Sequence, residues 1–362
     1  MNNYNTGLIF KWLKSENASS IETKKLAKKT REAFNMTARE YRKLLSYGRE
    51  KTKVLERLMS ANEWNKIDFS KIPSRAGIIY RNAFARRDIL AKKYEEFAKN
   101  KDTKVNADAL YPHDIAHKAF RVSTMTPIED PSRLMLQKYW DNLKDFYNGR
   151  KENAIAIVDT SGSMWGTPLE AAVSMGAYVA DKSHGPFANH FITFSNRPEL
   201  VKFEGVDIVD KFHRCKSANW GANTNLQAVF DMLLSIAKDK NVKTEDMPEK
   251  LFIFSDMEFD QCVSFNISSS YSWNRWSDYS KDSLDSDLER IAKQWAAAGY
   301  KLPKIIFWNL NARYNHIPAI GEGFSYVSGF SPSMVDAILS GKDGYDLMLE
   351  KLMSDRYKAV TA

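Results

Sequence analysis

Cysteine is almost missing from this 362-residue chain, which has only Cys215 and Cys262. Two cysteines exclude a disulfide framework and a zinc site built from several thiolates. Long hydrophobic runs are missing as well, since no apolar stretch approaches the roughly 18 residues that cross a bilayer. The first residues also lack the apolar core and cleavage site of a secretory signal. We therefore expect a cytoplasmic protein that has no membrane partner.

The common catalytic motifs are also absent. No glycine-rich loop ends in Gly-Lys-Ser or Gly-Lys-Thr, which excludes a P-loop nucleotide-binding site. No Ser-His-Asp or Cys-His set has the sequence context that nucleophilic catalysis needs. We therefore expect a protein that is not an enzyme.

Basic residues, in contrast, are abundant and unevenly distributed. Residues 1–150 hold 31 lysines and arginines against 18 aspartates and glutamates, a net charge of +13. Residues 151–362 hold 22 against 27, a net charge of −5. Such asymmetry is typical of a basic half that contacts nucleic acid or another acidic surface, although a solvated lysine-rich helical surface gives the same count.

The first 150 residues predict helices and almost no strands. Thr37 and Glu40 form a capping-box pattern at the start of one helix, and Asp130 followed by Pro131 is typical of the start of another. The expected helices cover 21–34, 37–45, 51–62, 74–98, 113–120 and 131–147. We therefore predict that residues 1–150 form a basic α-helical domain.

From Lys151 onward, short apolar runs of strand length alternate with helical segments. The expected strands are 153–158, 190–195, 199–203, 251–255 and 304–310, and the expected helices are 168–182, 206–215, 225–238, 283–299, 333–340 and 345–354. This alternation predicts that residues 151–362 form an α/β domain with a doubly wound, mostly parallel sheet. The closely spaced strands of 190–203 indicate an antiparallel edge.

In the stretch AIAIVDTSGSM, residues 154–164, an expected buried strand is followed directly by polar residues. In an open α/β sheet, ligands bind beyond the carboxyl ends of the strands. Asp159, Ser161 and Ser163 alternate there, so one carboxylate and two hydroxyls can converge. These hard oxygen donors suit Mg²⁺ or Mn²⁺. A polar turn followed by a helix cap would explain this stretch taken alone.

Two further polar segments lie later in the chain, each next to an expected strand or helix. Thr224 follows Gly221 in a loop that opens a helix, and Asp256 ends the buried strand LFIFS. Together the three segments resemble the metal-ion-dependent adhesion site of von Willebrand factor A domains. The resemblance covers about residues 151–340 and implies that Asp159, Ser161, Ser163, Thr224 and Asp256 hold the metal, with Asp256 acting directly or through water. It also implies that an acidic group of a protein partner completes the coordination. Asn223 and Asn225 depart from the usual pattern of the threonine loop.

The helical half carries a second resemblance. The stretches KWLKSENASS, TAREYRKLLS, LMSANEWNKIDFSKIPS and ALYPHDIA, with GYKLPKIIFWNLNAR and Trp220 in the other half, are similar to a family of phage, bacterial and eukaryotic proteins. That family pairs a helical region with a C-terminal A domain, in a layout similar to the Ro autoantigen. The resemblance implies binding of structured RNA, and a location in the host cytoplasm or the virion if the gene belongs to a phage.

The basic residues best placed for RNA lie on two expected helices, where several share one helical face. They are Lys24, Lys25, Lys28, Lys29, Arg31, Arg39, Arg42 and Lys43. An ordinary surface helix with an i,i+4 pair, Lys28 with Glu32, would carry the same residues.

The sequence is therefore compatible with three functions. The leading one is a metal-dependent binding protein that forms part of a ribonucleoprotein. The second is a phage structural or assembly protein that uses the A domain for protein contacts. The third is a metal-dependent hydrolase, for which Glu258 and Asp260 are the available bases.

Overall fold

The computed structural model describes most of the chain: residue 10 and residues 12–51, 55–194, 197–216, 225–257, 281–311, 324–329, 335, 338–339 and 344–353. The chain divides into two compact units, Met1–Asn106 and Ala107–Ala362. This division differs from the predicted boundary at residue 150, because the helices of 107–150 pack with the helices that cover the sheet.

The first unit is helical, as the sequence predicts. Its helices are α2 (Ile21–Ala33), α3 (Ala38–Lys51), α4 (Leu55–Ser60), α5 (Ser74–Arg86) and α6 (Asp88–Lys99), with short 3₁₀ turns at Trp64–Lys66 and Phe69–Lys71. The expected capping box is present, since the Thr37 backbone N–H donates to Glu40 Oε2 at 2.8 Å and the Glu40 N–H to Thr37 Oγ1 at 3.3 Å. The packed rings of Phe69, Phe84 and Tyr94 form the core under α5 and α6.

Several predicted helix boundaries in the first 150 residues are wrong. The predicted helix 74–98 is two helices, because Arg87 adopts extended backbone angles and its guanidinium stacks 4.6 Å over the Trp64 ring. The chain can then turn so that α5 and α6 pack against each other. The predicted helix 37–45 continues to Lys51, and the helix predicted to reach residue 147 ends at Asp141.

The second unit contains the predicted sheet. Its strands are β1 (Ala154–Asp159), β2 (His190–Phe194), β3 (Leu200–Lys202), β4 (Lys250–Ser255), β5 (Lys304–Asn309) and β6 (Phe324–Ser328), in the order β3-β2-β1-β4-β5-β6. All neighbours are parallel except β2 and β3, which form the expected antiparallel edge. Strand β6 is not among the predicted strands, because its residues FSYVS lack the continuous apolar run of the inner strands. The predicted fold class is confirmed.

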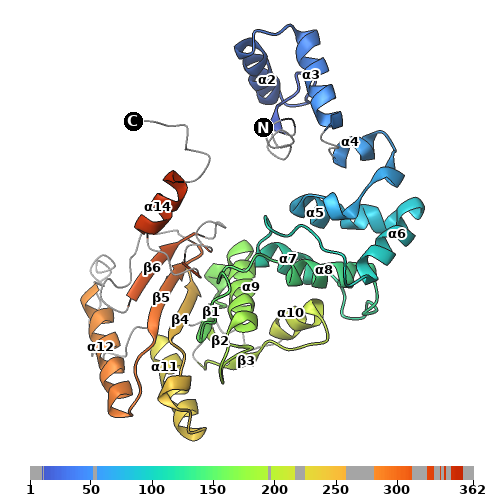
Figure 1. Ribbon diagram of the computed structural model, residues 1–362. Helices are drawn as coiled ribbons and strands as arrows, with labels where there is room; N and C mark the ends of the chain where they lie inside the picture. The colour runs from blue at the N-terminus through green and yellow to red at the C-terminus, as the bar shows by residue number, and fades with distance from the viewer. Residues whose placement is uncertain are drawn as a thin grey trace. The chain divides into compact units, whose positions relative to one another are not determined.

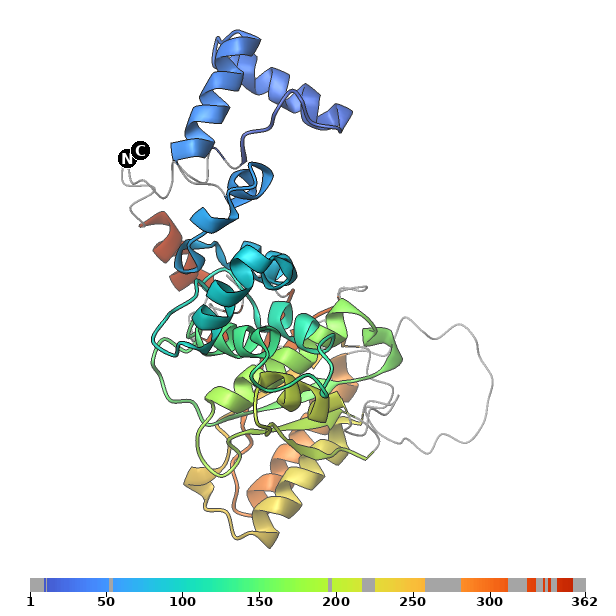
Figure 2. The same cartoon turned by 90° about the vertical axis from the view of Figure 1, so that its right-hand side faces the viewer.

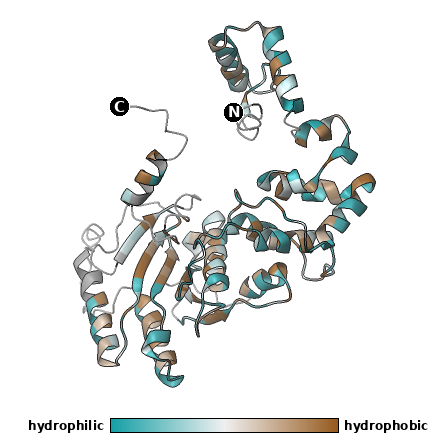
Figure 3. Cartoon of the chain, in the orientation of Figure 1, coloured by the Kyte–Doolittle hydropathy of each residue, from teal (hydrophilic) through white to brown (hydrophobic). Residues whose placement is uncertain are grey.

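Helices cover both faces of this sheet. The helices of the second unit are α7 (Pro112–Ala119), α8 (Pro131–Asp141), α9 (Thr167–Lys182), α10 (Ile208–Lys216), α11 (Leu226–Asp239), α12 (Lys281–Ala297) and α14 (Gly344–Leu352), with 3₁₀ turns at Gly162–Met164 and Thr244–Asp246. Figures 1 and 2 show α9 on one face and α11 and α12 on the other. On the latter face, Ile157, Ile253 and Phe307 pack with Phe230 and Trp295 in one buried cluster. The central strands are the most hydrophobic part of the sheet (Figure 3). Among the described residues, no helix has the length and apolar character needed to cross a membrane.

Helix α9 lies unusually close to β1. A Cβ atom added at Gly176 would stand 2.4 Å from Cγ2 of Val158, the residue that precedes Asp159. We expect Gly176→Ala to destabilise the second unit by about 1–3 kcal/mol through overpacking, against a gain of at most ~1 kcal/mol in helix propensity. Chemical unfolding of the variant measures this change. Adding Val158→Ala should restore most of the loss, and a fully stable single variant would show that α9 can move away from β1 at no cost.

Helices α7 and α8 join the second unit by packing with α9 and α10. A buried ion pair accompanies this packing: Arg133 on α8 donates to both carboxylate oxygens of Asp207, just before α10, at 2.6 and 2.7 Å. Its remaining guanidinium nitrogen donates to the carbonyl oxygens of Thr124 and Thr126. The side chains of Arg133 and Asp207 are only 4% and 8% exposed. The segment 107–150 is therefore bound to the sheet unit by charge as well as by apolar contact.

Candidate functional site

Two buried carboxylates lie at the same edge of the sheet. Asp159 is the last residue of β1 and is fully buried, and Asp256 directly follows β4 and is 5% exposed. The parallel register pairs Val158 with Phe254, so both strands reach this edge together. The strand order changes direction between β1 and β4, which is where open α/β sheets bind their ligands.

The two predicted serines converge beside Asp159. The backbone N–H of Ser161 donates to Asp159 Oδ1 at 2.9 Å, which folds the chain into a tight polar turn. The following 3₁₀ turn at Gly162–Met164 brings Ser163 Oγ to 3.0 Å from Ser161 Oγ. One carboxylate and two hydroxyl groups thus lie together, as the alternating pattern predicts.

The structure also reveals supporting residues that the sequence analysis did not single out. Ser255 Oγ donates to Asp159 Oδ2 at 2.5 Å, and the backbone N–H of Met257 donates to Ser255 Oγ at 3.0 Å. From the next strand, Asn311 Nδ2 donates to the carbonyl oxygen of Ser163 at 3.1 Å. The available signals were the serine just before Asp256 and the two asparagines of WNLN at the end of β5. These contacts fix the orientation of both the carboxylate and the serine turn.

The electrostatics of the cluster favour a bound cation. Burial raises the pKa of Asp159 to about 6, against hydrogen bonds from Ser255 and Ser161 that lower it, and the nearby charge of Asp256 raises it further. Within the described part of the chain, the hydrogen bonds to Asp159 come from hydroxyl and amide groups and none from a cationic side chain. A buried, ionised carboxylate is stable when a cation balances it. The residues present therefore fit a small divalent ion with oxygen ligands.

Some predicted site residues lie outside the described residues. These are Thr224 and the possible hydrolase bases Glu258 and Asp260. Helix α11 begins directly after this threonine loop. Asn225 caps the helix, because its side-chain oxygen accepts a hydrogen bond from the backbone N–H of Ala228 at 3.0 Å. The described residues contain no group of three or more His, Cys, Asp or Glu side chains that could hold a metal. The candidate set is instead two carboxylates with hydroxyl groups.

The predicted RNA-contact residues lie on α2 and α3. All of them are exposed except Arg31. Arg31 donates from Nε to Glu16 Oε1 at 2.8 Å and from a terminal nitrogen to the carbonyl oxygen of Met36, so it stabilises the first unit internally. The surface pair of Lys28 with Glu32 is present at 4.0 Å. The other lysines and arginines of the predicted set remain at the surface of the helical unit.

The charge asymmetry follows the structural units. Residues 107–150 contain six lysines and arginines and six aspartates and glutamates, so the whole excess of +13 belongs to residues 1–106. The sheet unit carries the net −5. The basic character is therefore a property of the helical unit alone.

The sheet order and flanking helices are those of a doubly wound α/β domain. The chain belongs to the family described as "Domain of unknown function (DUF7788)", whose model matches residues 153–359. A second model, "Domain of unknown function (DUF2828)", matches residues 8–158. The two matches meet within β1, close to the predicted boundary and beyond the point where the compact units divide.

Known proteins similar to this chain include one curated relative and two solved structures. Uncharacterized protein L728 of Acanthamoeba polyphaga mimivirus is 31% identical over 369 residues, covering 94% of this chain and 60% of that protein. The Ro (RSR) protein of Deinococcus radiodurans is 14% identical, with a TM-score of 0.44 over 95% of this chain and 75% of that one. The SpRpn10 VWA domain is 14% identical, with a TM-score of 0.28 over 59% of this chain and 100% of that one.

Proposed function

We propose that this chain is a binding protein, not an enzyme, in which the sheet-edge cluster holds Mg²⁺ or Mn²⁺ and a protein partner contributes an acidic group. The observation that carries the proposal is the convergence of Asp159, Ser161 and Ser163 with Asp256 at one edge, around a buried carboxylate whose hydrogen bonds come from neutral groups. A divalent cation held there would supply positive charge and coordination positions for a carboxylate from the partner.

The chain's own residues have separate tasks in this proposal. Asp159, Ser161 and Ser163 supply oxygen ligands from the turn after β1, and Asp256 supplies a second carboxylate directly or through water. Thr224 would add a hydroxyl from the loop before α11. Ser255 and Asn311 orient the ligands without binding the ion, by their hydrogen bonds to Asp159 and to the Ser163 carbonyl.

The second part of the proposal is that the helical unit binds RNA. Its net charge of +13 within 106 residues gives a strong field that attracts polyanions. Lys24, Lys25 and Lys29 on α2 are exposed and have no ion-pair partner among the described residues. Such lysines can neutralise phosphates without first breaking an internal contact.

A salt series with labelled RNA tests this second part. We expect the full chain to bind a hairpin RNA with an affinity that falls steeply as KCl rises. The double variant Lys25→Gln/Lys29→Gln should lose roughly tenfold in affinity. The steepness of the plot of log affinity against log salt should decrease by about two. Anisotropy of the labelled RNA measures both quantities.

The matched control removes two charges from the other unit. Lys238→Gln/Lys240→Gln changes the net charge equally, at exposed positions at the end of α11. It should bind RNA within twofold of the unmodified chain, on the order expected for distant surface charges. Equal losses in the two double variants, or binding insensitive to salt, would remove the helical unit from the proposal.

A further inference from the structure

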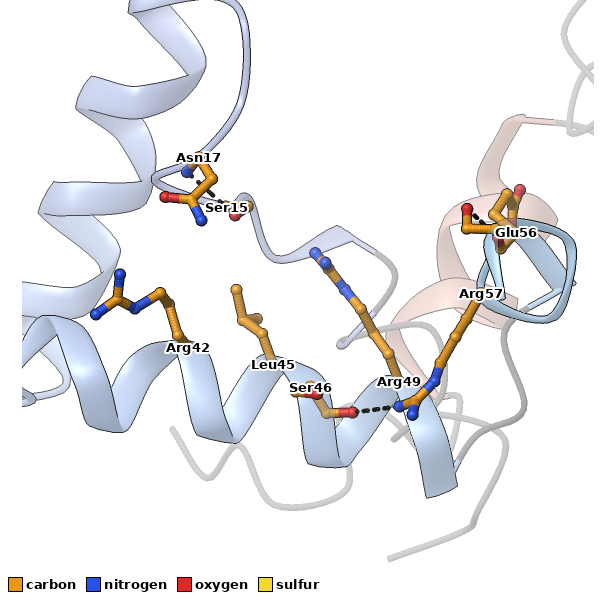
Figure 4. Close-up of a pocket in the computed structure, with 9 residues that line it drawn as sticks. Ser15, Asn17, Arg42, Leu45, Ser46, Arg49, Glu56 and Arg57 are labelled. Carbon is orange, nitrogen blue, oxygen red and sulfur yellow. Dashed lines mark hydrogen bonds between the residues drawn. The ribbon is translucent and has the colours of Figure 1, made fainter. Parts of the chain in front are cut away.

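An arginine-lined pocket opens within the helical unit. Its volume is about 640 Å³, and Figure 4 shows it between α3, α4 and the segment before α2. Arg42 and Arg49 lie on α3 and Arg57 on α4, while Ser15 and Asn17 come from the segment before α2. The remaining lining residues are Leu45, Ser46, Glu56 and Ser60. The lining therefore draws on three separate pieces of chain.

Two of the three guanidinium groups are held by backbone contacts. Arg49 donates from Nε to the carbonyl oxygen of Phe10 at 3.2 Å and from a terminal nitrogen to that of Leu13 at 2.9 Å. Arg57 donates to the carbonyl oxygen of Ser46 at 3.1 Å and lies 3.4 Å from a carboxylate oxygen of Glu50. These contacts fix the two side chains in place before any ligand arrives.

The third guanidinium group differs from these two. Arg42 is exposed and has no hydrogen-bond or ion-pair partner among the described residues. In Figure 4 it rises from α3 on the same side as Leu45 and Arg49, toward Asn17. All five of its N–H donors are thus available to a ligand at the mouth of the pocket.

The pocket's chemistry selects an anion with several oxygens. Three guanidinium groups face one lining carboxylate, Glu56, which also interacts with the Tyr80 hydroxyl. The serine hydroxyls and the Asn17 amide add neutral hydrogen-bond donors. Guanidinium groups bind phosphate with paired, charge-assisted hydrogen bonds. Among the described residues that line the pocket, Leu45 is the one apolar side chain and none is aromatic, so this lining offers no platform on which a base can stack.

We propose that this pocket binds a backbone phosphate of a nucleic-acid strand, independently of base sequence. The choice of a strand follows from the +13 charge of the surrounding unit, which favours a polyanion over a single phosphorylated side chain. The inference deepens the RNA part of the proposed function and rests on it for the source of the phosphate. Arg42, which is exposed and has no internal partner among the described residues, is the residue that meets the ligand first.

The test compares two arginines of the helical unit. Arg42→Gln removes a pocket guanidinium with no internal partner, and Arg86→Gln removes an exposed one on α5 that neither lines the pocket nor belongs to the predicted RNA-contact set. In the full chain we expect Arg42→Gln to weaken binding of a labelled 12-nucleotide RNA by about tenfold, as for loss of a charge-assisted contact. Arg86→Gln should change it less than about twofold. Oligo(A) and oligo(U) should bind alike, and both variants should keep the melting temperature of the unmodified chain.

A second arm uses AMP, measured by calorimetric titration, as a free source of phosphate. If AMP binding depends on Arg42 and RNA does not bind, the pocket still binds phosphate. The assignment of that phosphate to a nucleic-acid strand would then be overturned, together with the RNA part of the proposed function. RNA binding reduced equally by Arg42→Gln and Arg86→Gln would overturn the pocket and leave RNA binding intact. A phosphoserine peptide that displaces the RNA at lower concentration than AMP would also overturn the assignment to nucleic acid.

Discussion

Replacing Asp159 with asparagine should abolish binding of Mg²⁺ and Mn²⁺ while the sheet unit stays folded. The amide has the shape of the carboxylate. Its oxygen can still accept the hydrogen bond from the Ser161 N–H, and its NH₂ group can donate to the Ser255 hydroxyl with the direction of that bond reversed, so the turn after β1 keeps its support. It removes the negative charge that lies at the centre of the proposed ligand set. Asp159→Ala should abolish binding as well, with an added loss of stability because the Ser255 hydroxyl loses its partner.

Metal-dependent stability gives the clearest measurement of this effect. A ligand that binds only the folded chain stabilises it by about 2.7 kcal/mol at a concentration one hundred times its dissociation constant. The unmodified chain should therefore unfold at higher denaturant with MgCl₂ or MnCl₂ than with EDTA, and Asp159→Asn should show no difference. Asp239→Asn, an exposed carboxylate at the end of α11, is the control and should respond like the unmodified chain. A metal response retained by Asp159→Asn would remove the metal site from the proposal.

Replacing Asp207 with asparagine should have the largest effect on folding. The change leaves the guanidinium of Arg133 buried without its counter-charge, and breaking a buried ion pair on one side costs about 3–5 kcal/mol. Chemical unfolding followed by the fluorescence of the sheet unit measures the loss. The double variant Arg133→Met/Asp207→Leu should recover most of it, because neither side chain then carries a buried charge. A loss below about 1 kcal/mol in the single variant would contradict a structural role for the pair.

The pH dependence of this pair has a definite sign. Burial pushes the pKa of Asp207 upward, but hydrogen bonds from Arg133 and from the backbone outweigh it, and the pKa is lowered. A carboxyl group whose pKa is lower in the folded state stabilises the fold above its unfolded pKa of about 3.9. That contribution is lost as the pH falls through the folded pKa. The stability gap between the unmodified chain and Asp207→Asn should therefore be constant near neutral pH and narrow below about pH 4.

The sheet edge could be predicted well from sequence because its signals are local. Each apolar run is followed by polar residues, so the ends of the strands β1 and β4, and with them Asp159 and Asp256, can be located to within a few positions. Ser255 and Asn311 could not be assigned in the same way. Their roles depend on the register that sets β1, β4 and β5 side by side, and no spacing along the chain encodes that register.

The helical half was predictable in type but not in extent. Helix caps such as Thr37 with Glu40 are local, and the structure confirms them. The break at Arg87 has no such local signal, and the contact made there is with a distant residue, since the Arg87 guanidinium stacks over the ring of Trp64 more than twenty residues away. The assignment of 107–150 to the sheet unit likewise depends on Arg133 meeting Asp207, 74 residues later in the chain.

The close approach of α9 to β1 has a consequence for the sheet edge. Gly176 allows the helix backbone to press directly on Val158, and the peptide bond after Val158 leads straight into Asp159. The position of the carboxylate therefore depends on the packing of α9 against β1. A displacement of α9 along the sheet would act first on the strand residue that adjoins the oxygen cluster.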